Sequence, residues 1–283
     1  MAPSLPPDSL PTPARDVLVV GAGTATRRRD HLVAEEPMAI RVAGPGQAPV
    51  DIAVTMRTPG HDAELAIGFL VSEGLLLPVD LAGVTVEIGD PAAVATPENE
   101  LVVRIARPFD PAAAPARAFV ASASCGICGK ASLDDVAIRC APLPAGPRVD
   151  AAVVARLPDR LRAGQVLYAR TGGLHAAGIF DPTGALLALR EDVGRHNALD
   201  KLIGSAAFAG EIPLHDRLLA VSGRVSFEIV HKAAMAGIPI VAAGKAPTDL
   251  AVSAAEKLGL TLVGFVRPGG FNVYTGEERI ALG

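Results

Sequence analysis

The chain has 283 residues, of which half are hydrophobic and a fifth are charged, and its formal net charge is -4. Such a composition supplies a buried core and excludes a disordered chain. The negative balance argues against a nucleic-acid-binding protein, which usually carries a basic excess, and no apolar run is long enough to cross a membrane.

No apolar targeting segment follows the first methionine, and the chain has three cysteines, an odd number. We therefore expect a cytoplasmic protein in a reducing compartment. Cysteines that lie close together in such a compartment serve chemistry more often than structural disulfide bonding.

The N-terminal residues are rich in proline, and a mobile tail is expected over residues 1–24. The segment 16–30 contains Gly-x-Gly after an apolar run, as dinucleotide-binding folds do. Thr26 stands where the third glycine of that fingerprint is required. A strand and a turn are therefore favoured, with the arginines 27–29 on a solvated turn.

A strand-rich α+β domain is expected over residues 25–120. Segments 31–44 and 51–60 have the composition of strands that could form a hairpin, and 84–90 and 100–110 are further strands. A helix is predicted over 61–74, with Asp62 as its cap and Gly74 at its end.

Residues 121–148 are expected to form a cysteine loop and a linker, and 149–283 a second domain. A helix over 151–164 opens that domain, and its last part alternates strands and helices: 217–223, 226–237, 238–244, 247–259 and 260–267. Thr248 is the expected cap of the second of these helices and Gly259 its end. Alternation of this kind predicts an α/β domain with a mostly parallel sheet covered on both faces.

The stretch "SASCGICGK" places Cys125 and Cys128 in a C-x-x-C pair. A zinc site would need four ligands, with Cys140 as a third and a histidine as the fourth. A thioredoxin-like redox pair would lie between a strand and a helix, for which residues 130–140 are available. A sulfur carrier would need a mobile loop, which Gly126 and Gly129 permit, and Lys130 would favour the thiolate. The spacing alone leaves all three interpretations open.

A second group of polar residues follows predicted strand ends. His175 follows two glycines, Arg195 and His196 open a helix that begins at Gly194, and Arg224 lies between a strand and a helix. Ligands of open α/β sheets bind at such ends, and a helix N-terminus favours an anion. A phosphate-bearing ligand is one interpretation. The alternatives are a core histidine and an arginine neutralised by Glu191 and Asp192.

Zinc-dependent nucleobase deaminases offer a direct comparison, because they use His-x-Glu followed downstream by P-C-x-x-C. Here His175-Ala176-Ala177 lacks the glutamate, and the cysteine pair lies upstream without the proline. Deaminase chemistry is therefore disfavoured, although the order of strands and helices is compatible with that fold.

Long segments of the chain resemble the FdhD family of formate dehydrogenase accessory sulfurtransferases. They run from about Glu35 to Gly276 and comprise "EEPMAIRV", "TPGHDAELAIGFLVSEG", "SASCGICGK", "TGGLHAAGIF", "EDVGRHNALDKLIG", "SGRVSFEIVHKAAMAGIPIV", "APTDLAV" and "LTLVGFVRPGGFNVYTG".

The resemblance implies a three-layer, cytidine-deaminase-like domain without a zinc site over residues 149–283. It implies that Cys125 carries a persulfide taken from a cysteine desulfurase, with Cys128 as its partner. The sulfur would pass to the molybdenum cofactor in its bis(guanine dinucleotide) form, the bound substrate, for which GDP is a mimic. A homodimer that serves formate dehydrogenase is expected, with no nucleic acid, membrane or resident metal.

The same resemblance implies that the cofactor is contacted mainly through the backbone of Phe265, Val266, Arg267, Pro268, Gly269 and Gly270. Its two guanosine diphosphate arms would account for the phosphate-like strand ends, so Gly172, His175, Arg195, His196, Ser222 and Arg224 are expected to line the cleft. The alternatives are a non-catalytic chaperone that only binds the cofactor and a redox protein.

Overall fold

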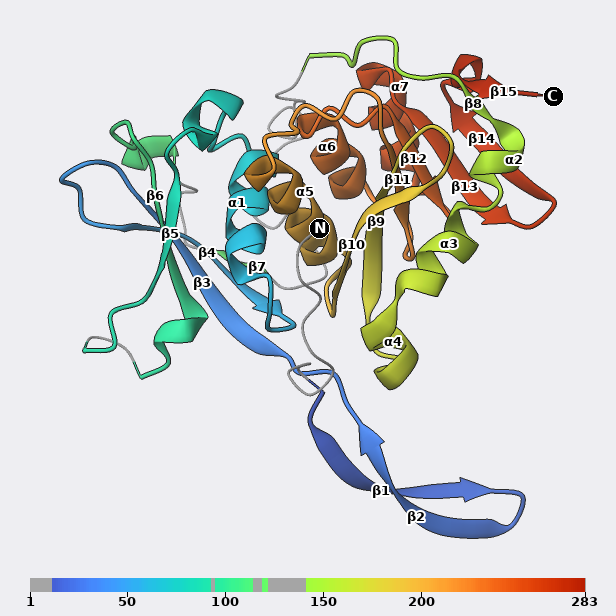
Figure 1. Ribbon diagram of the computed structural model, residues 1–283, viewed down its shortest axis with the longest axis horizontal. Coiled ribbons are helices and arrows are strands. Elements are labelled where there is room, and N and C mark those ends of the chain that lie inside the picture. The colour runs from blue at the N-terminus through green and yellow to red at the C-terminus, as the bar shows by residue number, and fades with distance from the viewer. Residues whose placement is uncertain (1–11, 93–94, 114–118, 122–140, 283) are drawn as a thin grey trace.

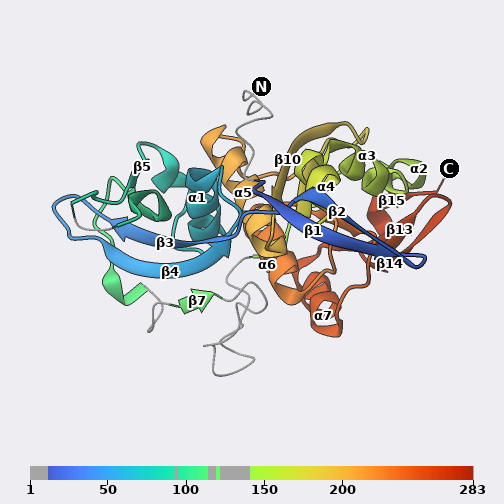
Figure 2. The ribbon, with the colours of Figure 1, turned by 90° about the horizontal axis from the view of Figure 1, so that it is seen from below.

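The computed structural model describes residues 12–92, 95–113, 119–121 and 141–282, and it is a mixed α/β protein with two main sheets (Figure 1). The two views of the ribbon agree that one helix from each half of the chain lies between these sheets (Figures 1 and 2). This arrangement determines where the candidate site lies.

The first main sheet has five strands in the order β5-β6-β3-β4-β7. Its strands are β3 (Glu36–Ala43), β4 (Val50–Arg57), β5 (Thr85–Ile88), β6 (Glu100–Arg104) and β7 (Phe119–Ala121). Short 3-10 helices, η2 (Pro78–Leu81), η3 (Pro97–Asn99) and η4 (Pro111–Ala113), connect them. Strands β3 and β4 pair antiparallel, which confirms the predicted hairpin. Alternate residues of β3, namely Met38, Ile40 and Val42, are buried, as expected for a strand with one face on a core.

Helix α1 (Asp62–Ser72) covers this sheet and begins differently from the prediction. The cap is His61, whose φ of 58° is left-handed, and no side chain caps the helix. The carboxylate of Asp62 instead accepts two hydrogen bonds of 3.1 Å from the buried Arg57 guanidinium. The prediction of an Asp62 cap is wrong because this charge-assisted contact is the stronger partner for the carboxylate.

The second main sheet has six strands in the order β10-β9-β11-β12-β13-β14. They are β9 (His175–Phe180), β10 (Leu186–Asp192), β11 (Leu218–Val221), β12 (Ile240–Ala243), β13 (Thr261–Arg267) and β14 (Gly270–Thr275). Only β11, β12 and β13 pair parallel; the other neighbours are antiparallel. The strands of the predicted alternation, β11, β12 and β13, are therefore parallel as expected. The sheet as a whole is not mostly parallel, because β9 and β10, and β13 and β14, are joined by short turns, whereas parallel neighbours need a long crossover.

Helices cover both faces of this sheet. On one face α5 (Arg195–Phe208), α6 (Phe227–Met235) and α7 (Asp249–Leu258) pack on residues such as Ile179 and Val241. On the other face α2 (Ala151–Val154) and α3 (Leu157–Gly164) pack with the small pair β8 (Val149–Asp150) and β15 (Ile280–Ala281). Helix α4 (Val166–Thr171) and the 3-10 helix η5 (Glu277–Arg279) complete the domain. As predicted, Thr248 caps α7 and Gly259 ends it.

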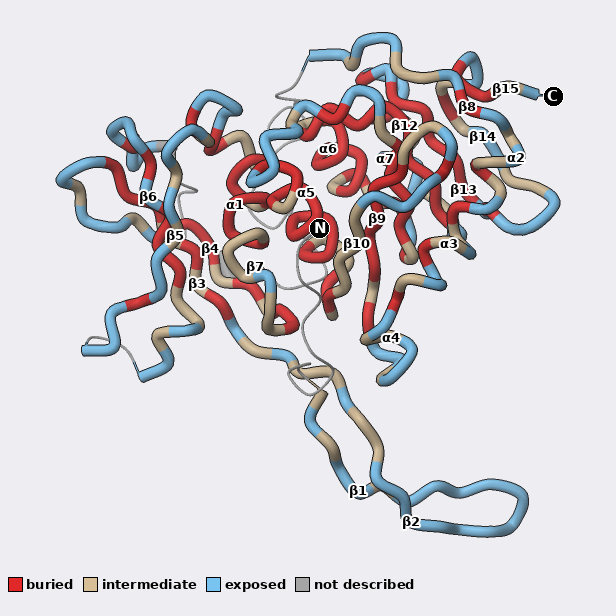
Figure 3. Tube along the Cα trace, viewed as in Figure 1, coloured by how far each residue is buried: buried red, intermediate tan, exposed pale blue. Residues whose placement is uncertain are grey.

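Helices α1 and α5 join the two halves through backbone contact. A Cβ on Gly68 would lie 1.8 Å from the carbonyl oxygen of Asp200, and one on Gly204 would lie 1.9 Å from that of Glu64. One continuous cluster of buried apolar residues runs through both halves around this contact, and it is visible as the buried centre in Figure 3. The two halves therefore share a core.

Ionic contacts at the same junction are buried as well. Arg190 binds the Glu64 carboxylate through two nitrogens, and although burial alone would raise the pKa of Glu64, these hydrogen bonds lower it to about 2. Lys232 lies 2.9 Å from Asp200, which also accepts a hydrogen bond of 2.8 Å from Ser72. Polar groups from α1, α5 and α6 are thus matched across the junction.

A hairpin of β1 (Ala14–Gly21) and β2 (Thr24–His31) extends away from the body and is largely exposed (Figures 1 and 3). Its turn is Ala22–Gly23, both with positive φ, as two-residue hairpins require. The Gly-x-Gly of the dinucleotide fingerprint therefore belongs to a hairpin, and the arginines 27–29 lie on a strand rather than on the predicted turn. The expected boundary at residue 24 falls inside this hairpin, and residues 1–11 lie outside the described part of the chain.

Candidate functional site

One edge of the six-stranded sheet gathers most of the predicted site residues. Strands β11, β12 and β13 end there, and β9, which runs antiparallel to β11, begins there. Strand β10 ends opposite His175, so α5 starts at the same edge. We call this the carboxyl edge, and it comprises residues 172–175, 192–196, 222–226, 244–248 and 265–267.

His175 is half-buried at this edge and contacts two neighbours. A Cβ placed on Gly223 would lie 3.4 Å from its Nδ1 and 3.6 Å from Cδ of Arg195, so the three residues are adjacent. Burial, and then the positive charges of Arg195 and His196, lower the pKa of His175. The imidazole is therefore neutral near pH 7, with a guanidinium beside it.

Arg195, the first residue of α5, keeps its guanidinium outside the ion pairs of the described residues. The helix cap, Gly194, offers no side-chain hydrogen bond, and Arg195 forms no ion pair with any residue that the structure describes. Glu191 accepts hydrogen bonds from the backbone of Leu167 and Tyr168, and Asp192 pairs with Lys201. Local neutralisation of Arg195 by these two carboxylates is therefore wrong, and the turn is free to take an anion.

His196 and Ser222 are held by their own fold. Nε2 of His196 lies 2.7 Å from Glu228 and 3.2 Å from Oγ of Ser226, so the start of α6 fixes the ring. The Ser222 hydroxyl accepts a hydrogen bond of 2.9 Å from the backbone of Ala176 and so fastens β11 to β9. Its own O–H can still donate to a ligand.

Two exposed cations follow neighbouring strands. Arg224 follows β11 and makes no ion pair within the described ranges, and Lys245 follows β12 in the same way. The two loops are tied together, because the backbone N–H of Thr248 donates to the carbonyl of Val225 over 2.9 Å. Lys245 is absent from the sequence prediction; its place after a buried strand and before a capped helix is the pattern that could have identified it.

The last residues of β13 include a strained backbone position. Phe265 has a φ of 53°, which non-glycine residues rarely adopt, and its side chain is 41 % exposed. Its backbone N–H donates to the carbonyl of Lys245, and the pairing with β14 shifts register between Gly264 and Arg267. Strain of this kind collects at functional sites, which supports backbone contact by Phe265, Val266 and Arg267 at the carboxyl edge.

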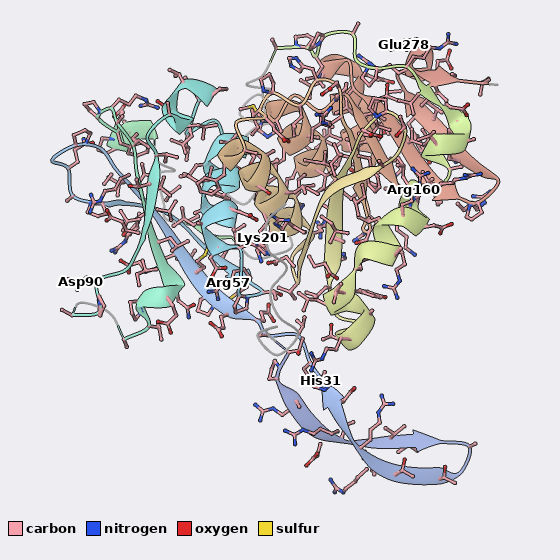
Figure 4. All side chains as sticks on the ribbon, viewed as in Figure 1. His31, Arg57, Asp90, Arg160, Lys201 and Glu278 are labelled. Atoms are coloured by element: carbon pink, nitrogen blue, oxygen red, sulfur yellow. The ribbon has the colours of Figure 1, made fainter. Side chains whose placement is uncertain are left out.

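Pro268, Gly269 and Gly270 lie apart from the histidine cluster. They line a groove of about 1350 Å³ together with Arg148, Arg156, Arg160 and Glu278, and neither His175 nor Arg195 lines it. Arg160 and Glu278 mark this side of the molecule in Figure 4. Gly172, with a φ of 71°, is exposed and ends α4 just before β9. The structure thus brings together most, but not all, of the predicted cleft.

The cysteines Cys125, Cys128 and Cys140, with Lys130 and the helix expected over 130–140, lie outside the described residues. The strand that leads to them is described: β7 pairs parallel with β4 and ends at Ala121, opposite Thr55. Cys125 follows four residues later, so the covalent chain limits its separation from Ala121 to about 14 Å. Within the described ranges no group of three His, Cys, Asp or Glu side chains could hold a metal ion, and no helix could cross a membrane.

The sequence is similar to one known protein family and to several of its members. The sequence model of the FdhD/NarQ family matches residues 33–281. The sulfur carrier protein FdhD of Streptomyces coelicolor is 47% identical over 281 residues and covers 96% of each chain. That of Mycobacterium tuberculosis is 46% identical over 278 residues, covering 95% of this chain and 98% of the relative.

A solved structure shares the fold. It is the crystal structure of a candidate formate dehydrogenase accessory protein from Desulfotalea psychrophila, with a TM-score of 0.71 and 24% identity. The match covers 95% of this chain and 99% of that one. The arrangement of the sheets and helices is therefore that of an already known architecture.

Proposed function

Because this chain belongs to the FdhD/NarQ family, we propose that it is a sulfurtransferase that accepts sulfur as a persulfide on Cys125. A cysteine desulfurase is the donor. The acceptor is the molybdenum cofactor in its bis(guanine dinucleotide) form, bound as substrate before it enters formate dehydrogenase. The curated relatives named as sulfur carriers support the general kind of activity.

One observation carries the proposal: the strand that leads to the cysteines ends beside the carboxyl edge. Ala121 at the end of β7 pairs with Thr55, and the Thr55 hydroxyl donates to Asn197 in the first turns of α5. The same helix begins with Arg195, next to His175. The last described residue before the cysteines thus lies one strand away from the helix turn that carries Arg195, which supports delivery of sulfur at this edge.

The charges of this edge suit a phosphate-bearing substrate. A cation at a helix N-terminus opposes the helix dipole by about 0.3–1 kcal/mol, a cost that an anion bound between them removes. Arg195 at the start of α5, Arg224 after β11 and Lys245 after β12 come from three different segments, which is how an extended pyrophosphate would be held.

The chemistry of the cysteines balances without a resident metal. The Cys125 thiolate attacks the outer sulfur of the donor persulfide, a new S–S bond forms and the donor thiolate leaves. Attack of the Cys128 thiolate on the inner sulfur would then close a disulfide and release the outer sulfur as hydrosulfide. The two cysteines supply the two electrons, and a thiol reductant restores them.

Binding of the cofactor's guanosine diphosphate arms is tested by titrating GDP, their mimic, into the protein in a calorimeter. Arg224→Ala should weaken binding by about tenfold or more, because a charge-assisted hydrogen bond to phosphate contributes about 1.5–3 kcal/mol. Arg28→Ala is the matched control, since Arg28 is an exposed arginine on the projecting hairpin.

An unchanged affinity in Arg224→Ala would remove this residue from the site. Tight GDP binding without any sulfur on the protein would favour the alternative of a chaperone that only binds the cofactor. The proposed uptake of sulfur therefore needs a separate measurement, made on Cys125 itself.

A further inference from the structure

A fully buried polar network joins the end of β4 to the start of α5. At its centre the Asp192 side chain is completely inaccessible to solvent. Its Oδ1 accepts hydrogen bonds from the backbone of Gly194 and from Nδ2 of Asn197, over 2.8 and 3.1 Å. Its Oδ2 accepts from the backbone of Thr58 over 3.1 Å and lies 2.7 Å from Nζ of Lys201. Lys201 is labelled in Figure 4, where the two halves of the molecule meet.

Asn197 extends the network to β4, the strand that pairs with β7. Its Nδ2 donates to the carbonyl of Met56 over 2.7 Å, and its Oδ1 accepts from the Thr55 hydroxyl over 3.2 Å. Thr55 is the β4 residue that pairs with Ala121. A chain of direct contacts therefore runs from the last residue of β7 through β4 to the turn that carries Arg195.

Both sides of the junction are fixed by more than one bond. Nζ of Lys201 donates to the carbonyl of Thr58 over 2.7 Å, and the Thr58 hydroxyl accepts from the backbone of Val193 over 3.1 Å. A buried ion pair adds little net stability compared with well-packed apolar residues. A network in which every polar group is matched, however, specifies one geometry.

We propose that Asp192 and Asn197 are positioning residues that hold the end of β4, and with it the paired strand β7, in register with the anion-binding turn of α5. They fix the point at which the chain leaves β7 toward Cys125 relative to the turn that carries Arg195, and they touch neither β7 nor Arg195 through a side-chain hydrogen bond that the structure describes. This inference rests on the proposed function and adds to it the part of the fold that couples sulfur loading to delivery.

The test is the protection of Cys125 by GDP. The full chain is treated with iodoacetamide with and without saturating GDP, and the modification rate at Cys125 is followed by peptide mass spectrometry. In the wild type GDP should slow this rate. In Asn197→Ala and Thr55→Val most of this protection should be lost, although calorimetry shows that the nucleotide still binds. Thr55→Val keeps the side-chain shape and removes only the hydroxyl.

Ser72→Ala is the matched control, because the Ser72 hydroxyl also links α1 to α5, through Asp200, but away from the carboxyl edge. It should lower the melting temperature to a similar extent and keep the protection. Equal protection in Asn197→Ala, Thr55→Val and the wild type would overturn the proposal, as would a wild type that GDP does not protect. Failure of the proposed function would be seen separately, as a wild type that takes up no sulfur.

Discussion

His175 is a neutral imidazole beside the positively charged Arg195, and this neighbour contributes to the pH dependence of the protein's stability. Burial and the neighbouring positive charges keep the pKa of His175 below its ordinary value. The folded protein therefore binds a proton at this residue less readily than the unfolded chain. Stability from this group is fully present above the ordinary pKa and is lost as the pH falls from there through the lowered pKa of the folded protein.

Binding of an anion at Arg195 should reverse this effect. A phosphate beside His175 favours the imidazolium, so its pKa rises and GDP binding should take up protons. Below about pH 6.5, the ordinary pKa of histidine, the affinity should increase as the pH falls, by at most about tenfold per pH unit for one proton. Calorimetry in buffers of different ionisation enthalpy measures this uptake. His175→Gln should bind GDP without it; the same uptake in that variant would assign the proton to another group.

Individual site residues could be predicted from the sequence where a polar or charged residue lies next to the end of a predicted strand. His175, Arg195 and Arg224 were predicted in this way, and the structure places them at one edge. The roles of Asp192 and Asn197 could not be predicted, because their partners Thr58, Met56 and Thr55 lie more than 130 residues earlier in the chain. Such partners become visible only in the folded molecule.

The contact between α1 and α5 depends on two glycines. At Gly68 and Gly204 a methyl group would collide with the backbone of the facing helix. The helices could admit it only by moving apart, which would also open the buried cluster around them. Neither glycine is explained by helix propensity, since glycine destabilises a helix interior.

Gly68→Ala should therefore destabilise the protein by about 3 kcal/mol or more, a fall of roughly 6–12 °C in Tm. Gly21→Ala on the projecting hairpin is the control, because a methyl group there meets nothing within 4 Å. Thermal unfolding followed by circular dichroism measures both. A Gly68→Ala protein as stable as the wild type would show that the two helices do not touch as described.

At the element scale, hydrophobic periodicity predicted the strands β3, β4, β11, β12 and β13 and the helices α5, α6 and α7. The alternation of strands and helices predicted the parallel pairing of β11, β12 and β13, but not the antiparallel strands beside them. Two short turns, after β9 and after β13, create antiparallel pairs at the edges of the second sheet. Turn geometry rather than strand composition decides these pairings, and it is local to a few residues.

The whole molecule is two sheets around one shared core, with the carboxyl edge next to their junction. The sequence suggested two separate domains and a cysteine loop between them. In the structure, β7 of the first sheet pairs with β4, and Thr55 of β4 donates a hydrogen bond to Asn197 near the start of α5. Under the proposed function, delivery of sulfur at this edge would depend on the junction and on neither half alone.

The most direct test of the account is the mass of the intact protein after incubation with a cysteine desulfurase and free cysteine. Wild type, Cys125→Ala and Cys128→Ala are compared, before and after treatment with a thiol reductant. The account predicts a gain of about one sulfur mass in the wild type and in Cys128→Ala, removed by the reductant, and no gain in Cys125→Ala. A wild type that gains no sulfur, or a Cys125→Ala protein that gains as much as the wild type, would contradict it.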